Sequence, residues 1–109
     1  MSRTVAILGA TGLVGRTTLE ILDQRAFPLD AVRLLASDRS ASRTMRFRGR
    51  DVAVEAVSER AFDGVWLALF ATSAELSRQW APIARRAGAI VVDYSSAFRM
   101  EPDVPLVVP

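Results

Sequence analysis

Short runs of apolar residues, each closed by a glycine or a polar residue, recur along the chain and predict strands. They span residues 4–8, 31–36, 65–70 and 89–93, and a further apolar stretch at 106–108 is expected to begin a fifth strand. Because these runs are apolar almost throughout, they suit strands that are covered on both faces of a parallel sheet.

Helical periodicity separates these strands. Apolar side chains recur three and four residues apart from Val14 to about Gln24, and again over residues 73–87. The two stretches predict amphipathic helices. Pro82 falls inside the second one, where we expect it to bend or split the helix. Gly88 is well placed to end that helix.

A hairpin is predicted between the second and third of these strands. Residues 44–47 and 52–57 would form its strands, and residues 48–51 its turn. Elsewhere strands alternate with helices, which is typical of α/β proteins with right-handed crossovers. We therefore expect one domain over residues 1–109, with a Rossmann-like, doubly wound, mostly parallel sheet and helices on both faces.

Composition limits the chemistry that this chain can perform. A length of 109 residues fits one compact domain, and 50% hydrophobic with 24% charged residues excludes a disordered chain. The chain contains neither Cys nor His. This excludes disulfides, zinc sites of the usual kind and the Cys/His or Ser/His nucleophile pairs. We predict no metal site and no catalytic residue within this chain.

The charge pattern points away from nucleic acid and membranes. The net charge of +2, from 14 basic and 12 acidic residues, is too small to imply a nucleic-acid partner. A local cluster of arginines between Arg39 and Arg50 reads as a solvated or anion-facing loop. No signal peptide or membrane-spanning stretch is present, so we expect a cytoplasmic protein. The chain stops at Pro109 within an apolar run, and we expect it to be truncated.

Three glycines at regular spacing follow the first predicted strand and open the first predicted helix: Gly9, Gly12 and Gly15. In nucleotide-binding βαβ units the first permits a tight turn, the second lets backbone approach a pyrophosphate, and the third lets the helix pack closely. The amides of Thr11 to Val14 would then face the phosphates. The position between strand and helix favours a dinucleotide site over a purely structural glycine turn.

The residues after the second strand bear on the choice between NAD and NADP. An acidic residue at this point binds a ribose diol, whereas Arg accommodates a 2′-phosphate. Asp38 lies at the spacing expected for NAD, but Arg39, together with Ser37, Ser40 and Arg43, offers several donors to a phosphate dianion. We favour NADP; the alternative is a solvent-facing turn.

Four stretches together resemble aspartate-semialdehyde dehydrogenase. They are residues 5–15 (VAILGATGLVG), 35–40 (LASDRS), 68–71 (ALFA) and 91–109 (VVDYSSAFRMEPDVPLVVP), and the last is the most specific. The resemblance implies the family's cofactor domain, and a full-length homodimer that reduces β-aspartyl phosphate with NADPH on the route to lysine, threonine and methionine. The family's nucleophilic Cys and acid/base His would lie beyond residue 109.

The resemblance also assigns roles to individual residues. The cofactor phosphates would be contacted by the residues between Gly9 and Gly15, namely Thr11, Gly12, Leu13 and Val14. The 2′-phosphate would be bound by Ser37, Arg39 and Ser40. The cofactor site would be lined by Ala71, Thr72 and Ser73. Arg99 would bind the phosphate of a small acyl-phosphate substrate, since a guanidinium offers it two parallel hydrogen bonds. The alternative for Arg99 is a surface ion pair with Glu101 or Asp103.

The chain departs from the family's pattern at two places. Tyr94 stands where the family usually carries Asn, which puts a bulky phenol on the substrate or nicotinamide side. Residues 71–75 (ATSAE) replace a more glycine-rich turn, which narrows the pocket. Two alternatives stay open: N-acetyl-γ-glutamyl-phosphate reductase, against which the Ser-Ser-Ala-Phe-Arg-Met segment argues, and a non-catalytic NADP-binding module.

Overall fold

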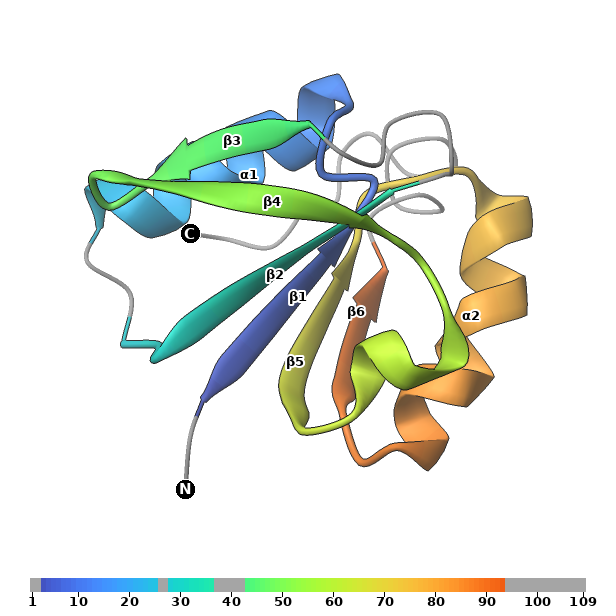
Figure 1. The fold of residues 1–109 in the computed structure, drawn as a ribbon. Helices are drawn as coiled ribbons and strands as arrows, with labels where there is room; N and C mark the ends of the chain where they lie inside the picture. Colours follow the sequence, from blue (N-terminus) through green and yellow to red (C-terminus); the bar gives the residue numbers. More distant parts are fainter. Residues whose placement is uncertain (1–2, 26–27, 37–42, 94–109) are drawn as a thin grey trace.

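The computed structural model describes residues 3–25, 28–36 and 43–93 (Figure 1). Its elements, in chain order, are β1 (Thr4–Leu8), α1 (Leu13–Gln24), β2 (Ala31–Ala36), β3 (Thr44–Phe47), β4 (Arg50–Ala56), the 3-10 helix η2 (Glu59–Phe62), β5 (Val65–Phe70), α2 (Ala74–Arg86) and β6 (Ile90–Asp93). The strands form one six-stranded sheet in the order β3-β4-β2-β1-β5-β6. Only β3 is antiparallel to its neighbour, so the predicted mostly parallel sheet is confirmed.

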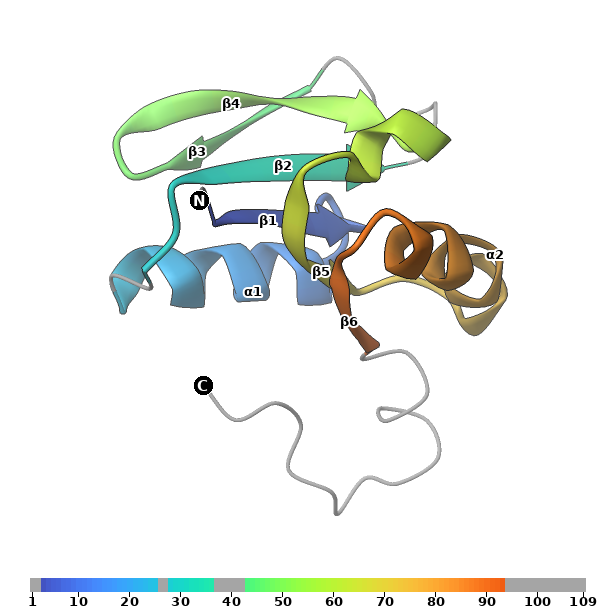
Figure 2. The same cartoon turned by 90° about the horizontal axis from the view of Figure 1, so that it is seen from below.

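The alternating side chains of β1 divide the core into two halves. Val5 and Ile7 belong to a cluster that includes the buried face of α1. Ala6 and Leu8 belong to a second cluster, with residues from α2 and η2. Since successive side chains of a strand point to opposite faces, helices cover both faces of the sheet, as predicted (Figure 2).

Helix α1 extends over the predicted range and packs by a narrow buried stripe. Leu19 and Leu22 are buried in the core, and the third buried side chain of this stripe, Thr18, is polar. Its hydroxyl donates to the carbonyl of Val14 at 2.8 Å, so the buried polar group is satisfied within the helix.

Of the two predicted effects of Pro82, a bend or a split, the split does not occur, because α2 runs without interruption through this residue. Pro82 is exposed, and the carbonyl that its missing N–H would have served belongs to Arg78, which is also exposed and can bond water instead. Gly88 ends the helix as predicted. The amides of Gly88 and Ala89 donate to the carbonyls of Arg85 and Ala84 at 2.9 and 3.0 Å.

The hairpin has a tighter turn than predicted. Strand β4 begins at Arg50, so two residues connect the strands where four were expected. Arg48 and Gly49 both adopt positive φ, 51° and 80°. This backbone is typical of two-residue hairpin turns, which Asn-Gly or Asp-Gly usually signals. An Arg at the first position gives no such signal, so the sequence did not reveal the turn.

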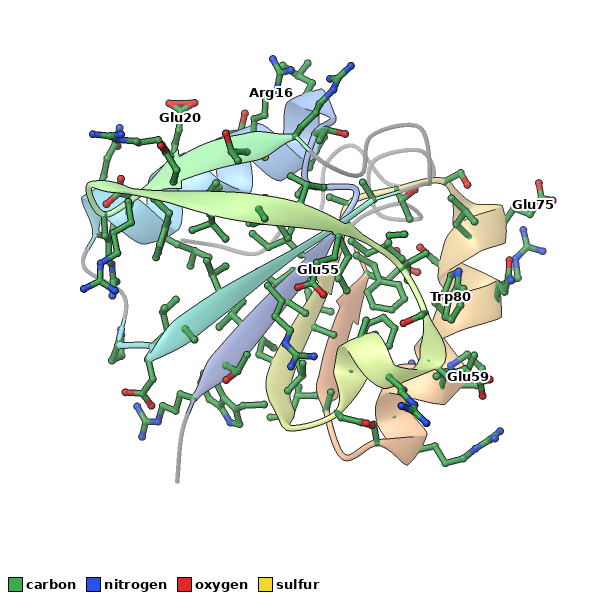
Figure 3. The ribbon with its side chains drawn as sticks, in the orientation of Figure 1. Arg16, Glu20, Glu55, Glu59, Glu75 and Trp80 are labelled. Atoms are coloured by element: carbon green, nitrogen blue, oxygen red, sulfur yellow. The ribbon has the colours of Figure 1, made fainter. Side chains whose placement is uncertain are left out.

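The 3-10 helix η2, which the sequence did not predict, adds buried side chains to the core on one face of the sheet. It places Phe62, which is fully buried, with its ring centroid 6.0 Å from that of Phe70 and 6.3 Å from that of Trp80 (Figure 3). The guanidinium of Arg33, on β2, donates to the carbonyl of Ala61 at 2.8 Å. This bond accounts for a charged residue within an otherwise apolar strand.

Candidate nucleotide-binding site

The carboxyl ends of β1 and β5 form the point where the connections of the sheet diverge. The two strands are parallel neighbours, and their last residues, Leu8 and Phe70, lie in register. From there one connection leads to α1 on one face and the other to α2 on the opposite face (Figure 1). Open α/β sheets bind ligands in the crevice at such a switch point.

Gly9 brings the two connections into direct contact. It has φ of +89°, which L side chains rarely adopt, and a Cβ at this position would lie only 2.3 Å from the carbonyl oxygen of Ala71. The amide of Ala71 in turn donates to the carbonyl of Leu8 at 2.9 Å. The first glycine is therefore required by both the turn and the close approach of the β5–α2 connection.

Gly15 lets α1 pack against the same turn. A Cβ there would lie 2.1 Å from the carbonyl oxygen of Gly9 and 2.8 Å from the Cα of Ala10. Both are backbone atoms that cannot move without displacing the turn. The third glycine therefore fixes the helix in the position that the βαβ pattern predicts.

Gly12 differs from its two neighbours in the motif. A Cβ at this position would meet only the carbonyl oxygen of Gly9, at 3.4 Å, which is ordinary contact. Its φ is −79°, a value open to any residue. Nothing within the described residues therefore requires a glycine here.

The start of α1 has no side-chain cap. The first N–H groups of a helix have no partner within the helix, and Gly12, at the N-cap position, has no side chain to supply one. The first turn contains no acidic residue. Arg16 projects from this end of the helix (Figure 3), and Leu13 is 83% exposed. The start of α1 thus has neither a side-chain cap nor an acidic residue, which suits an anion at this positive helix end.

The end of β2 is joined to the glycine turn. The carbonyl of Leu35 accepts from the amides of Gly9 and Ala10 at 2.9 and 3.2 Å. The chain enters the predicted 2′-phosphate segment directly after Ala36. The residues predicted for the 2′-phosphate and for the substrate phosphate lie outside the described residues, and their roles remain predictions: Ser37, Arg39, Ser40 and Arg99.

The structure places the second predicted lining segment against the glycine turn. Ala71 and Thr72 are half-buried beside Gly9, and a Cβ on Gly9 would lie 3.2 Å from the Cβ of Thr72. Ser73 is exposed, and its Oγ accepts from the amide of Leu76 at 3.2 Å, so this side chain caps α2. The two segments that were predicted to share a site therefore meet, although contact with a nucleotide remains a prediction.

Sequence reasoning missed one polar contact near this edge. The Oγ of Ser77 donates to Oδ1 of Asp93 at 3.3 Å. The two residues are 16 positions apart, and the packing of α2 against β6 brings them together.

Neither a cluster of possible metal ligands nor a membrane-spanning helix occurs in the described part of the chain. Among residues 3–25, 28–36 and 43–93, no three acidic side chains gather where a metal ion could be held. No helix in the same ranges is long and apolar enough to cross a membrane.

Known proteins resemble this chain over almost its whole length. It is 53% identical over 105 residues to aspartate-semialdehyde dehydrogenase 2 of Vibrio cholerae, covering 96% of this chain and 31% of that protein. It is 48% identical over 110 residues to aspartate-semialdehyde dehydrogenase of Aquifex aeolicus, covering 100% and 32%. The chain therefore spans about a third of the length of these relatives.

A solved structure agrees with the fold. The crystal structure of aspartate semialdehyde dehydrogenase II complexed with ASA from Vibrio cholerae matches with a TM-score of 0.85 at 51% identity, over 100% of this chain and 32% of that one. The family model described as semialdehyde dehydrogenase, NAD binding domain, matches residues 4–109. The resemblance found in the sequence is confirmed, and the chain belongs to the semialdehyde dehydrogenase NAD binding domain family.

Proposed function

We propose that this chain binds NADP as the cofactor domain of an aspartate-semialdehyde dehydrogenase. The observation that carries the proposal is the contrast within the glycine motif. Gly9 and Gly15 are required by the packing of this chain, whereas nothing among the described residues requires a glycine at position 12, at an uncapped helix start. A pyrophosphate is the ligand that makes use of both features, because it needs close backbone approach and free N–H groups.

The relatives support an activity for the whole protein. Proteins named aspartate-semialdehyde dehydrogenase are similar to this chain over 96% or more of its length, and one was crystallised as a complex with ASA. We propose that a protein carrying this domain reduces β-aspartyl phosphate to aspartate semialdehyde and phosphate, and works as a homodimer. Arg99 would hold the substrate phosphate through paired hydrogen bonds.

The composition of this chain limits its part in the proposed reaction to cofactor binding. With no Cys and no His, these residues contain neither a thiol nucleophile nor an imidazole base. Their part is to bind and orient the dinucleotide, which supplies the hydride when it is bound. We expect this chain alone to show no turnover with aspartate semialdehyde, phosphate and NADP. Measured turnover in that assay would overturn this expectation.

The preference for NADP over NAD rests on the segment after β2. Arg39, with Ser37 and Ser40, offers a charged fork and two hydroxyls to a 2′-phosphate. The competing reading takes Asp38 as the acceptor for an unmodified ribose, which would favour NAD.

Calorimetric titration of the chain with NADP and NAD tests this preference. We expect NADP to bind more tightly, and Arg39→Ala to weaken NADP by about tenfold through the loss of a charge-assisted hydrogen bond, with little change for NAD. Arg25→Ala, at the exposed far end of α1, serves as the matched control and should change neither affinity. Equal binding of both nucleotides, or equal losses in Arg39→Ala, would contradict the NADP assignment.

A further inference from the structure

A buried hydroxyl links the first turns of α2 to the end of β6. Ser77 is 1% exposed, and its Oγ lies 3.3 Å from Oδ1 of Asp93. Asp93 is the last residue of β6 and lies in register with Phe70, the last residue of β5. Residues in register point to the same face of a sheet, so the carboxylate of Asp93 faces the side that α2 covers.

The two halves of α2 are held in different ways. In the C-terminal half, Ala81 and Ala84 are buried in the core, with Trp80 and Ile83 packed beside them. In the N-terminal half, Ser77 is the one side chain buried to this degree. Apolar packing therefore anchors the far end of the helix, whereas a hydrogen bond anchors the end nearest the glycine turn.

That end of α2 leads directly into the wall of the nucleotide site. The amide of Ser77 donates to the carbonyl of Ser73 at 3.0 Å. Ser73 is the last residue of the connection that begins at Ala71. The amide of Ala71 donates a hydrogen bond to the carbonyl of Leu8, and its carbonyl oxygen leaves no room for a Cβ on Gly9. A displacement of the first turns of α2 would therefore move residues 71–73 relative to the glycine turn.

We propose that Ser77 and Asp93 form a positioning pair for the nucleotide site. By tying the start of α2 to the end of β6, they keep the β5–α2 connection at the separation from Gly9 that a bound dinucleotide requires. In this proposal the pair acts through the position of residues 71–73. The inference rests on the proposed function and adds two residues that no glycine motif identifies.

The test is a set of NADP titrations of the 109-residue chain. Ser77→Ala and Asp93→Ala should each weaken NADP binding by about fivefold, a modest loss because a bond of 3.3 Å is long for a hydroxyl donor. The double variant should bind no more weakly than either single variant, since both remove the same bond. Asp93→Asn should bind within about twofold of the unchanged chain, because its amide oxygen still accepts from Ser77.

A control separates positioning from loss of stability. Ala81→Gly lowers the stability of α2 without touching the pair, and should leave the affinity unchanged at a temperature where urea titration shows the chain folded. Equal weakening in Ala81→Gly, multiplied losses in the double variant, or Asp93→Asn as weak as Asp93→Ala would each overturn the proposal. An NADP affinity that is unchanged in Ser77→Ala would overturn this inference but not the proposed function. Absence of NADP binding by the unchanged chain defeats the proposed function as well.

Discussion

The two long helices begin in opposite ways. At α2, the Oγ of Ser73 accepts from the amide of Leu76, and Glu75 places a negative charge in the first turn (Figure 3). At α1, the N-cap is Gly12, and no acidic residue occupies the first turn. The last turn of α2 contains Arg85 and Arg86, whereas that of α1 contains no basic residue.

This difference is what the proposed function predicts for a structural helix and a nucleotide-binding helix. The charges and cap of α2 complement the helix dipole at both ends, so α2 needs no ligand to be satisfied. The start of α1 omits each of these features, and it lies where the sheet connections diverge. Sites at which a chain breaks the local rules of stability are expected to be functional ones. We interpret the start of α1 as reserved for an anion.

The largest effect is expected where α1 packs on the glycine turn. Gly15→Ala would place a Cβ 2.1 Å from the carbonyl oxygen of Gly9, so α1 or the turn must shift. We expect the free energy of unfolding in urea to fall by about 3 kcal/mol, as for an overpacked core, and NADP binding to be lost. Gln24→Ala, exposed on the same helix, is the control. A stability loss below about 1 kcal/mol would contradict the packing role.

The next effect separates binding from folding. Gly12→Ala adds a Cβ with only one neighbour, at 3.4 Å, so the free energy of unfolding should change by less than about 1 kcal/mol. The same methyl group would stand where the pyrophosphate approaches the backbone. We expect NADP affinity to drop by at least about tenfold, or about 1.4 kcal/mol. Unchanged affinity in a titration of this variant would show that the nucleotide lies elsewhere.

The cap of α2 should contribute to stability. Ser73→Ala removes the acceptor for the amide of Leu76, and we expect a loss of about 1 kcal/mol in the free energy of unfolding. Ser73→Asp should restore that loss, because a carboxylate also accepts from this amide and complements the helix dipole. A loss in Ser73→Ala that Ser73→Asp fails to restore would mean that Ser73 acts through something other than capping.

The smallest effect sets the baseline for the others. Arg46 and Asp51 pair at 3.1 Å on the hairpin, with side chains 70% and 66% exposed. Exposed pairs of this kind contribute little, so Asp51→Asn should change the free energy of unfolding by no more than about 0.5 kcal/mol and leave NADP binding intact. A larger change would show that the hairpin is coupled to the rest of the sheet more tightly than this exposed pair suggests.

The sequence predicted the parallel part of the fold well because its signals are local. The bounds of β2 and β5 agree with the apolar runs at 31–36 and 65–70, and the helical periodicity located the start of α1 to within one residue. The prediction was wrong where the structure depends on backbone conformation or on distant partners. The two-residue turn at Arg48 and Gly49, where four residues were expected, is the example.

The candidate site was predictable in part for the same reason. The packing roles of Gly9 and Gly15 could be predicted from the glycine spacing. Only the structure shows that no described residue requires a glycine at position 12. The contact between Gly9 and Ala71 joins two distant segments of the chain, and was expected because the family resemblance placed both segments in the cofactor site. The bond from Ser77 to Asp93 has no sequence signal at all.

The most direct test of the account gives α1 the cap that α2 already has. Gly12→Asp should raise the free energy of unfolding by about 0.5 to 1 kcal/mol, since the carboxylate caps the helix and complements its dipole. The same carboxylate would repel a pyrophosphate. In paired calorimetric titrations, we predict saturable NADP binding by the unchanged chain and none by Gly12→Asp at the same concentrations. Equal binding by both chains would contradict the claim that the uncapped N-terminus of α1 binds the nucleotide.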